Sequence, residues 1–381
     1  MQKRDARSES QTVVFAASCL GRLGRWGNQI FQWSALRLAA ELHGAKLLCP
    51  DWAGRRCLVE AASDELLTAD VDASLPLCAD RPVLSHAGFR AWALTREPLK
   101  SSLLSGDVSG HQLRRSLPQV NAAILLQPST MTGYPGPRAA AYWGWFAFHT
   151  SAFAPHRCRF AQLLALSPAL AAAVVAHEYL LRASGDVQRP MWGIHMRCGE
   201  GFTPLGADGR EKSTAPAEAW TPPEQTGMDA QTSSTTGIWR DTGVFWSAPA
   251  EWYATWLQNF VAVPHAPAPI VLLFSDDPDA ARRALGPQGA SVTLVNTTAL
   301  AESFGGGADG AALADWFLMA RCETLVISNS TYSFAAAMLA TAVDGQRRTC
   351  FRPDPIARGI VEFDPWNASP TLKLPPDETA T

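Results

Sequence analysis

The fold of this 381-residue chain is decided by the stretch Asp315-Trp-Phe-Leu-Met-Ala-Arg-Cys-Glu-Thr-Leu-Val-Ile-Ser-Asn-Ser-Thr-Tyr-Ser-Phe-Ala-Ala-Ala-Met-Leu339. It predicts an amphipathic helix, a buried strand at residues 324–327, a polar turn and a second helix of small apolar residues. The turn offers hydroxyls and backbone N–H groups where the second helix begins, and an anion such as a diphosphate prefers such a place. Taken alone, the same residues also fit an ordinary helix N-cap.

Further strand and helix patterns on either side predict an α/β fold with parallel sheets. The chain starts with a strand at residues 12–17, a glycine-rich turn at 21–29, a helix at 30–43 that Gly44 ends, and a strand at 45–49. Later strands are expected at residues 191–195, 270–274, 291–295 and 324–327, and helices at 251–261 and 278–285. Continuous apolar strands of this kind are typical of sheets that are covered on both faces.

The length of the chain and its composition predict two domains, at residues 1–185 and 186–370. An aromatic-rich strand or strand end at 142–148 and a helix from about 159 to 182 close the first domain. A stretch rich in Thr, Ser, Pro and Gly at 202–242 is too long for an ordinary loop and predicts a polar insertion in the second domain. The tail at 371–381 is expected to be disordered.

Charge and cysteine usage exclude several classes of protein. The formal net charge is -3 and no long Lys/Arg run occurs, so neither a nucleic-acid partner nor an anionic membrane is indicated. The eight cysteines are dispersed without a Cys-x-x-Cys pair, which predicts free thiols rather than a zinc site.

The chain contains no pattern of a signal peptide or membrane span. As written, we expect a cytoplasmic protein, or a Golgi protein if an N-terminal anchor is missing.

Three more strand ends carry polar or glycine-rich residues. The first is Gly21-x-x-Gly24-x-x-Gly27-Asn28-Gln29. Its glycines let the backbone approach a ligand closely, and its two amides add neutral donors. The spacing departs from the dinucleotide fingerprint, so a nicotinamide cofactor is disfavoured.

The second strand end is Gly193-Ile-His195-Met-Arg197-Cys-Gly199-Glu200-Gly201. Strand alternation places His195, Arg197 and Gly199 on one side and Met196 and Cys198 on the other. An arginine at the carboxyl end of a strand is well placed to fork onto a phosphate. The alternative is a surface arginine beside a core histidine.

The third strand end is Phe274-Ser275-Asp276-Asp277-Pro278. Its two carboxylates could cap the following helix, hold a metal, or bind ribose hydroxyls or a base. Because the carboxyl ends of parallel strands are where open α/β sheets bind ligands, these segments together predict a nucleotide-type ligand.

Together the segments resemble the α-1,2-fucosyltransferase family, with wider kinship to the protein O-fucosyltransferases. Members carry a Gly-x-x-Gly-Asn-Gln-x-Phe-Gln start, which is similar to residues 24–32 here. The family's His-x-Arg-Arg-Gly-Asp motif resembles residues 195–200, and its Phe-Ser-Asp-Asp strand end resembles residues 274–277. The most specific match is the helix, strand and turn at 315–334.

The resemblance implies a GT-B fold, two Rossmann-like domains facing a cleft, and an inverting, metal-independent transfer of fucose from GDP-fucose. No cofactor besides this donor is implied, and the acceptor would be a hydroxyl of a glycan or glycoprotein, with an α-1,2 linkage to galactose favoured. Arg197 and Glu200 are the implied catalytic residues. The implied GDP-fucose-binding residues are Gly27, Asn28, Gln29, His195, Arg197, Gly199, Ser275, Asp276, Asp277, Asn329, Ser330, Thr331 and Phe334.

The sequence departs from the family pattern in two places. Cys198 stands where the second arginine is expected, and Glu200 replaces the aspartate just before the polar insertion. Two alternatives therefore stay open. One is a protein O-fucosyltransferase or another nucleotide-sugar transferase of the same fold. The other is a catalytically degenerate protein that binds glycans or sugar nucleotides.

Overall fold

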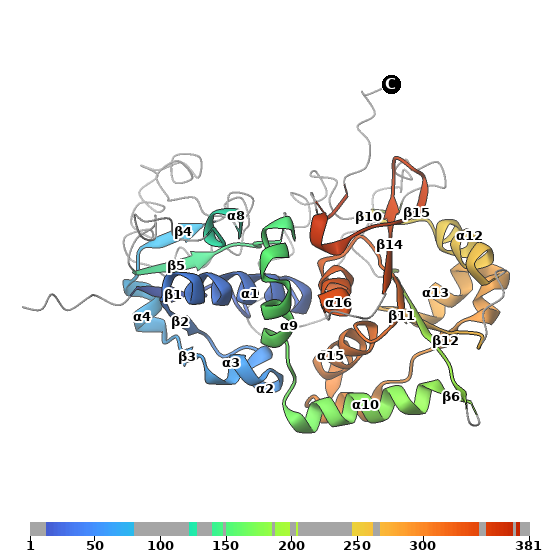
Figure 1. Ribbon diagram of the computed structural model, residues 1–381, viewed down its shortest axis with the longest axis horizontal. Coiled ribbons are helices and arrows are strands. Elements are labelled where there is room, and N and C mark those ends of the chain that lie inside the picture. Colours follow the sequence, from blue (N-terminus) through green and yellow to red (C-terminus); the bar gives the residue numbers. More distant parts are fainter. Residues whose placement is uncertain are drawn as a thin grey trace, which may run out of the picture.

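The structure is a computed structural model. It describes residues 13–79, 122–127, 139–147, 150–184, 187–198, 203–204, 246–261, 267–342, 348–368 and 371–373. Two α/β units lie side by side in it, one from each half of the chain (Figure 1). The first unit is built on a parallel sheet and the second on a mostly parallel one, so the predicted fold class is confirmed.

The first unit contains a five-stranded sheet in the order β3-β2-β1-β5-β4, in which every neighbouring pair is parallel. Helix α1 (Trp26–His43) connects the two strands of the predicted βαβ unit, β1 and β2, and Gly44 ends it in a left-handed conformation with φ 60°. The strands are β1 (Val14–Ala16), β2 (Lys46–Cys49), β3 (Glu65–Leu66), β4 (Leu77–Ala79) and β5 (Ala139–Trp143).

The second unit contains a six-stranded sheet in the order β12-β11-β8-β13-β14-β15. In chain order its strands run 3-2-1-4-5-6, which is the strand order of a Rossmann fold. The last strand alone is antiparallel to its neighbour. The strands are β8 (Met191–Met196), β11 (Ile270–Ser275), β12 (Thr293–Leu294), β13 (Thr324–Val326), β14 (Thr349–Asp354) and β15 (Gly359–Glu362).

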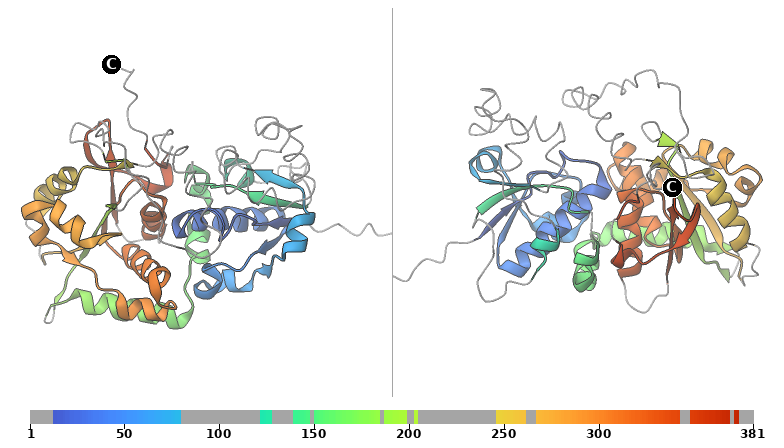
Figure 2. Two further views of the ribbon diagram at one scale, coloured as in Figure 1. Left: turned by 180° about the vertical axis from the view of Figure 1, so that it is seen from behind. Right: turned by 90° about the horizontal axis from the view of Figure 1, so that it is seen from above.

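Helices cover both faces of the second sheet, as its continuous apolar strands predict. On one face, Ile194 and Met196 of β8 pack with residues of α12 (Ala250–Val261) and α13 (Pro278–Ala284). On the other face, Leu325 packs with residues of α15 (Gly307–Met319) and α16 (Thr331–Ala342). Figure 2 shows these layers from behind and from above.

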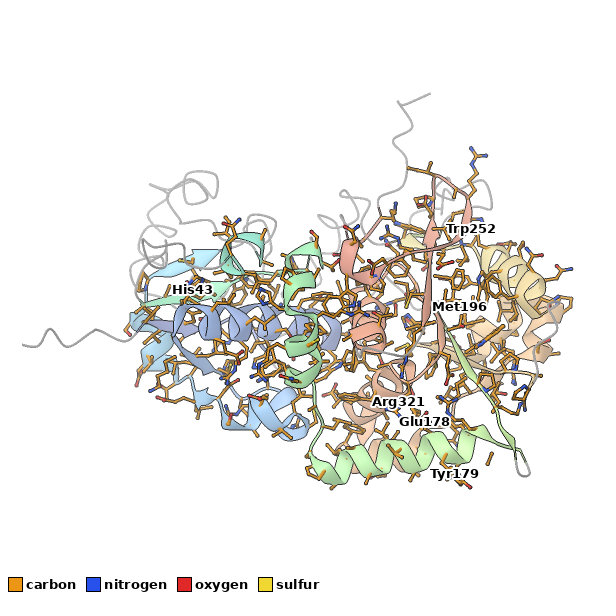
Figure 3. The ribbon with its side chains drawn as sticks, in the orientation of Figure 1. His43, Glu178, Tyr179, Met196, Trp252 and Arg321 are labelled. Carbon is orange, nitrogen blue, oxygen red and sulfur yellow. The ribbon has the colours of Figure 1, made fainter. Side chains whose placement is uncertain are left out.

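Two helices lie between or beneath the units. Helix α9 (Arg157–Leu163) contacts both α1 and α16, and α10 (Pro168–Arg182) packs on α15 and α14 (Thr298–Ser303) of the second unit. In Figure 3 the side chains of Glu178 on α10 and Arg321 lie close together beneath the second sheet. They form an ion pair at 2.6 Å, and Arg182 pairs with the same carboxylate at 2.8 Å.

The remaining elements are short. They are α2 (Gly54–Cys57), α3 (Val59–Ser63), α4 (Ala69–Ser74), α8 (Ala122–Leu125), β6 (Ala183–Ser184), β7 (Val187–Gln188), β9 (Thr203–Pro204), β10 (Trp246–Ser247), and the 3-10 turns η2 (Thr150–Ala152), η3 (Ala154–His156), η5 (Gly286–Ser291) and η6 (Pro365–Asn367). Among the described helices, none has the length and apolar character needed to cross a membrane.

Several predicted boundaries are wrong. The helix expected at 159–182 is two helices, because Pro168 begins α10 and cannot continue α9. Of the strand or strand end expected at 142–148, Tyr142 and Trp143 do end β5, but Phe146 has a positive φ of 53° that no strand accommodates. The strand expected at 291–295 has only two residues, because η5 occupies its start. Of the tail expected to be disordered, Thr371–Lys373 is described and hydrogen-bonded.

One apolar cluster runs through both units without a break. It contains Phe15 and Phe31 of the first unit together with Phe334 and Trp366 of the second. Phe31 lies 6.4 Å from Phe334 between ring centroids, and Phe160 of α9 meets Trp366 edge-on at 5.4 Å. The two sheets therefore share a core instead of being joined by a linker alone.

Candidate functional site

The carboxyl ends of β8 and β13 are neighbours at the point where the strand order of the second sheet reverses. Open α/β sheets bind their ligands outside such a switch point. Residue Arg197 follows β8 directly, and the turn Ser328–Ser330 follows β13 and leads into α16. Two segments that are 133 residues apart in sequence therefore meet, as the sequence predicts.

Arg197 is the cation at this meeting point. Its Nη1 donates to Ser330 Oγ at 3.5 Å, and its Nε lies 3.6 Å from Asp276 Oδ2. The side chain is 25 % exposed. Burial, and to a lesser extent the charge of Arg25, lowers the pKa of Arg197, while Asp276 acts to raise it. A guanidinium keeps its proton under such a shift, so Arg197 offers a partly desolvated positive charge.

The N-terminus of α16 forms the second part of the site. Ser330 caps the helix, because its Oγ accepts from the backbone N–H of Tyr332 at 3.3 Å. The first turn of the helix contains no acidic residue. The positive end of its dipole is therefore not compensated by a nearby carboxylate of its own.

The N-terminus of α1 forms the third part and comes from the first unit (Figure 1). Its N-cap position, Arg25, makes no side-chain capping bond, and its first turn also lacks an acidic residue. A Cβ on Gly27 would lie 2.3 Å from Cα of Tyr332, so only glycine permits this approach of the two helices. The hydroxyl of Thr331 donates to Asn28 Oδ1 at 2.7 Å across the same junction.

His195 is a buried, uncharged side chain that contacts the turn after β13. Its Nδ1 lies 2.9 Å from Ser328 Oγ, and its ring lies 5.4 Å from the ring of Tyr332. Burial, reinforced by the charge of Arg197, lowers the pKa of His195 to about 3. The imidazole is therefore neutral near pH 7 and holds the turn after β13 by a hydrogen bond.

The acidic strand end serves local structure first. Asp276 Oδ1 accepts from the backbone N–H of Cys198 at 2.8 Å, which ties β11 to β8. Asp277 caps α13 by accepting from the N–H of Ala280 at 2.9 Å. Ser275 Oγ accepts from the N–H of Asp277 at 3.1 Å. Asp276 and Asp277 are exposed on the same edge of the sheet as Arg197. Their contact with a nucleoside stays a prediction from the sequence.

Three other residues that were predicted to bind the donor make contacts within the protein instead. Phe334 is 1 % exposed and packs between Phe31 and Phe363, so it lies in the core and not on the surface of the site. The side-chain amide of Asn329 pairs with the backbone of Lys373. Gln29 donates to the carbonyl of Gly24 at 3.1 Å. Gly199, Glu200 and nearly all of the insertion at 202–242 lie outside the described residues.

Sequence reasoning missed two residues of the site. Tyr332 packs its backbone on Gly27 and its ring near His195, and Arg25 lies within electrostatic reach of Arg197. Both lie inside or beside the quoted motifs, so their places in the sequence could have identified them.

Within the part of the chain that the structure describes, no three His, Cys, Asp or Glu side chains are grouped to hold a metal ion. The combination of the Arg197 guanidinium, with Arg25 nearby, and two helix N-termini is suited to an anion. The donors come from both units.

Comparisons with known proteins give matches among solved structures. No protein-family model matches the chain, and no curated protein does. It is similar to the NodZ alpha-1,6-fucosyltransferase of Bradyrhizobium soaked with GDP-fucose, at 14% identity and a TM-score of 0.49, over 93% of this chain and 99% of that one. A mutant of Arabidopsis thaliana FUT1 in complex with GDP is 12% identical, with a TM-score of 0.47, over 99% of this chain and 81% of that one. POFUT1 in complex with GDP is 12% identical, with a TM-score of 0.44, over 89% and 97%.

Proposed function

We propose that this chain is a fucosyltransferase that transfers fucose from GDP-fucose to a hydroxyl of an acceptor glycan. An α-1,2 linkage to galactose, inversion at the sugar carbon and independence from metal ions are parts of the proposal. The observation that carries it is the convergence of Arg197 with the N-termini of α1 and α16 at the switch point of the second sheet.

The motifs support the choice of donor. Residues 24–32, 195–200, 274–277 and 315–334 resemble α-1,2-fucosyltransferase motifs. Each contributes a residue to this one junction, namely Asn28, Arg197, Asp276 and Ser330. Residues from four distant segments that match one family and meet at one place are better explained by a shared ligand than by independent helix caps. Guanosine recognition falls to Asp276 and Asp277 on the exposed edge.

The chemistry follows from where charge develops. The bond between the anomeric carbon and the β-phosphate oxygen breaks, a bond from the acceptor oxygen forms, and GDP leaves with added negative charge. Fixed donors aimed at that charge supply the largest stabilisation of the transition state. Arg197 and the hydroxyl of Ser330 are such donors, and neutral His195 keeps their turn in place. The acceptor proton passes to a base, for which Glu200 is the sequence candidate.

A donor screen tests the proposal. Melting temperature is measured with GDP-fucose, GDP-mannose, UDP-glucose and UDP-galactose, and GDP release is then followed across a panel of acceptor glycans. We expect the largest stabilisation with GDP-fucose and acceptor-dependent release of GDP. A response to the UDP sugars alone contradicts the proposal. Binding of GDP-fucose without turnover on any acceptor would favour the degenerate binding protein.

A further inference from the structure

The end of the described chain crosses back to the first unit after β15. The backbone N–H of Thr150 donates to the carbonyl of Ala368 at 3.2 Å, and the N–H of Ala368 donates to Thr150 Oγ1 at 3.2 Å. Thr371 is 2 % exposed, and its hydroxyl donates to the carbonyl of Ala147. We call Ala368 and Thr371–Lys373 together the C-terminal strap.

The strap then reaches the second unit at Lys373. The side-chain amide of Asn329 makes two hydrogen bonds to this residue, accepting from its N–H at 3.0 Å and donating to its carbonyl at 3.1 Å. Trp246 Nε1 donates to the same carbonyl at 2.8 Å, and Lys373 Nζ lies 3.0 Å from Asp354. The backbone of Lys373 is thus fixed by two side chains from different elements.

Both ends of the strap are attached next to the candidate site. Asn329 directly precedes Ser330, which caps α16 and contacts Arg197. Ala147 belongs to the segment after β5 that also contains Trp145. The Trp145 ring lies so close to Gly24 that a Cβ there would be 2.7 Å from it. One attachment therefore adjoins the turn before α16, and the other adjoins the turn before α1.

We propose that the C-terminal strap is a positioning element of the anion site, and that Asn329 is a positioning residue rather than a contact to the donor. The inference rests on the proposed function. Donors that stabilise developing charge must be held in place before the reaction. The two helix N-termini touch at Gly27 and through Thr331 and Asn28, and the strap adds a second connection outside the shared apolar core.

Four variants separate positioning from general stability. Asn329→Ala removes both amide bonds, and a chain that ends at residue 370 removes Thr371–Lys373 altogether. Lys373→Ala is the matched control for the first, because it deletes the ion pair with Asp354 but leaves the backbone bonds to Asn329. A chain that ends at residue 376 is the control for the truncation. Asn329→Ala keeps the test informative if the shorter chain fails to fold.

Two measurements are made on each variant: GDP affinity by calorimetry, and amide hydrogen exchange without ligand. In Asn329→Ala and the chain ending at residue 370, we expect faster exchange confined to residues 24–32 and 328–334. We also expect a GDP dissociation constant raised roughly tenfold. The two controls should match the full chain. Equal exchange in all five proteins, or a uniform increase throughout the two strap variants, would overturn the proposal.

Failure of the proposed function would look different. If the full chain does not bind GDP, the donor assignment is wrong whatever the variants do. The ligand-free exchange pattern then still decides whether the strap fixes the two turns. If GDP binds equally well to all five proteins, the donor site stands and the positioning role is wrong.

Discussion

Two features of the site act on the charge of Arg197. Burial works against its charge, and Asp276 at 3.6 Å partly neutralises it. Because both side chains are partly exposed, this ion pair is weak enough for a dianionic ligand to compete with it. A guanidinium whose carboxylate partner can be displaced is suited to gripping a leaving diphosphate.

Replacement of Arg197 tests its role directly. In Arg197→Ala we expect kcat/KM for GDP-fucose to fall by about 2 to 4 kcal/mol of transition-state stabilisation, by analogy with loss of an oxyanion donor. Arg283→Ala, which removes the same charge from the exposed surface of α13, is the matched control and should behave as the full chain does. Near-normal turnover in Arg197→Ala would refute the assignment.

Asp315 gives the molecule a pH dependence of its own. Burial raises the pKa of this carboxyl to about 6 against its hydrogen bond from Thr297. The folded chain thus holds the proton more tightly than the unfolded chain does. The contribution of Asp315 is full below the unfolded pKa and is lost as pH rises through about 6.

Denaturant unfolding of the full chain and of Asp315→Asn, in steps between about pH 4 and about pH 7, measures this effect. We expect the free energy of unfolding of the full chain to fall relative to the variant by about 2 kcal/mol over that range. His195, whose lowered pKa acts with the opposite sign, is common to both proteins and cancels in the difference. Parallel curves would mean that Asp315 titrates normally.

At the scale of elements, the approach of α1 to α16 builds the site. Trp26 stacks on Trp52 and meets Trp316 edge-on, with ring centroids 5.8 Å and 5.7 Å away. These contacts extend α1 to Trp26, four residues before the start at residue 30 that its sequence predicts. Gly27 and Asn28 therefore belong to the first helical turn rather than to a loop.

Gly27→Ala tests the need for this approach. Alanine favours a helix over glycine by about 1 kcal/mol, so on local grounds the change stabilises the protein. Because the added Cβ would lie 2.3 Å from the backbone of Tyr332, we expect a net loss of about 2 kcal/mol in stability instead. Gly359→Ala is the control, since its Cβ would meet nothing nearer than 3.9 Å. A Gly27→Ala protein as stable as the full chain would show that the helices do not touch there.

Local sequence patterns predicted much of the fold and part of the site. Continuous apolar runs predicted β8, β11 and β13, and the polar residues that follow these strands predicted that Arg197 and Ser330 lie close together. The start of α1 was not predictable, because burial of Trp26 between two other tryptophans overrides weak helix signals. The break before Pro168 was predictable, because proline has no backbone N–H and its ring clashes with the preceding helical turn. The pairing of Asn329 with Lys373 depends on a long-range return of the chain, which no local pattern shows.

On the scale of the whole molecule, the two units share one apolar core. The apolar cluster that includes Phe31, Phe334 and Trp366 spans both halves, and α9 packs on α1 and α16 together. We therefore expect the two units to unfold together. The hydrogen bonds of the C-terminal strap add to the same coupling.

Differential scanning calorimetry of the full chain tests this coupling. We expect one transition whose calorimetric enthalpy equals its van't Hoff enthalpy, because the shared core makes unfolding cooperative. Saturating GDP should move the whole transition upward rather than split it. Two resolved transitions, with only one responding to GDP, would show that the units fold independently.

The crystal structure of the full chain with GDP tests the central claim most directly. The account predicts the diphosphate between the N-termini of α1 and α16, with a β-phosphate oxygen about 3 Å from the guanidinium of Arg197 and another near Ser330. A nucleotide bound elsewhere on the molecule, with Arg197 still paired with Asp276, would contradict it.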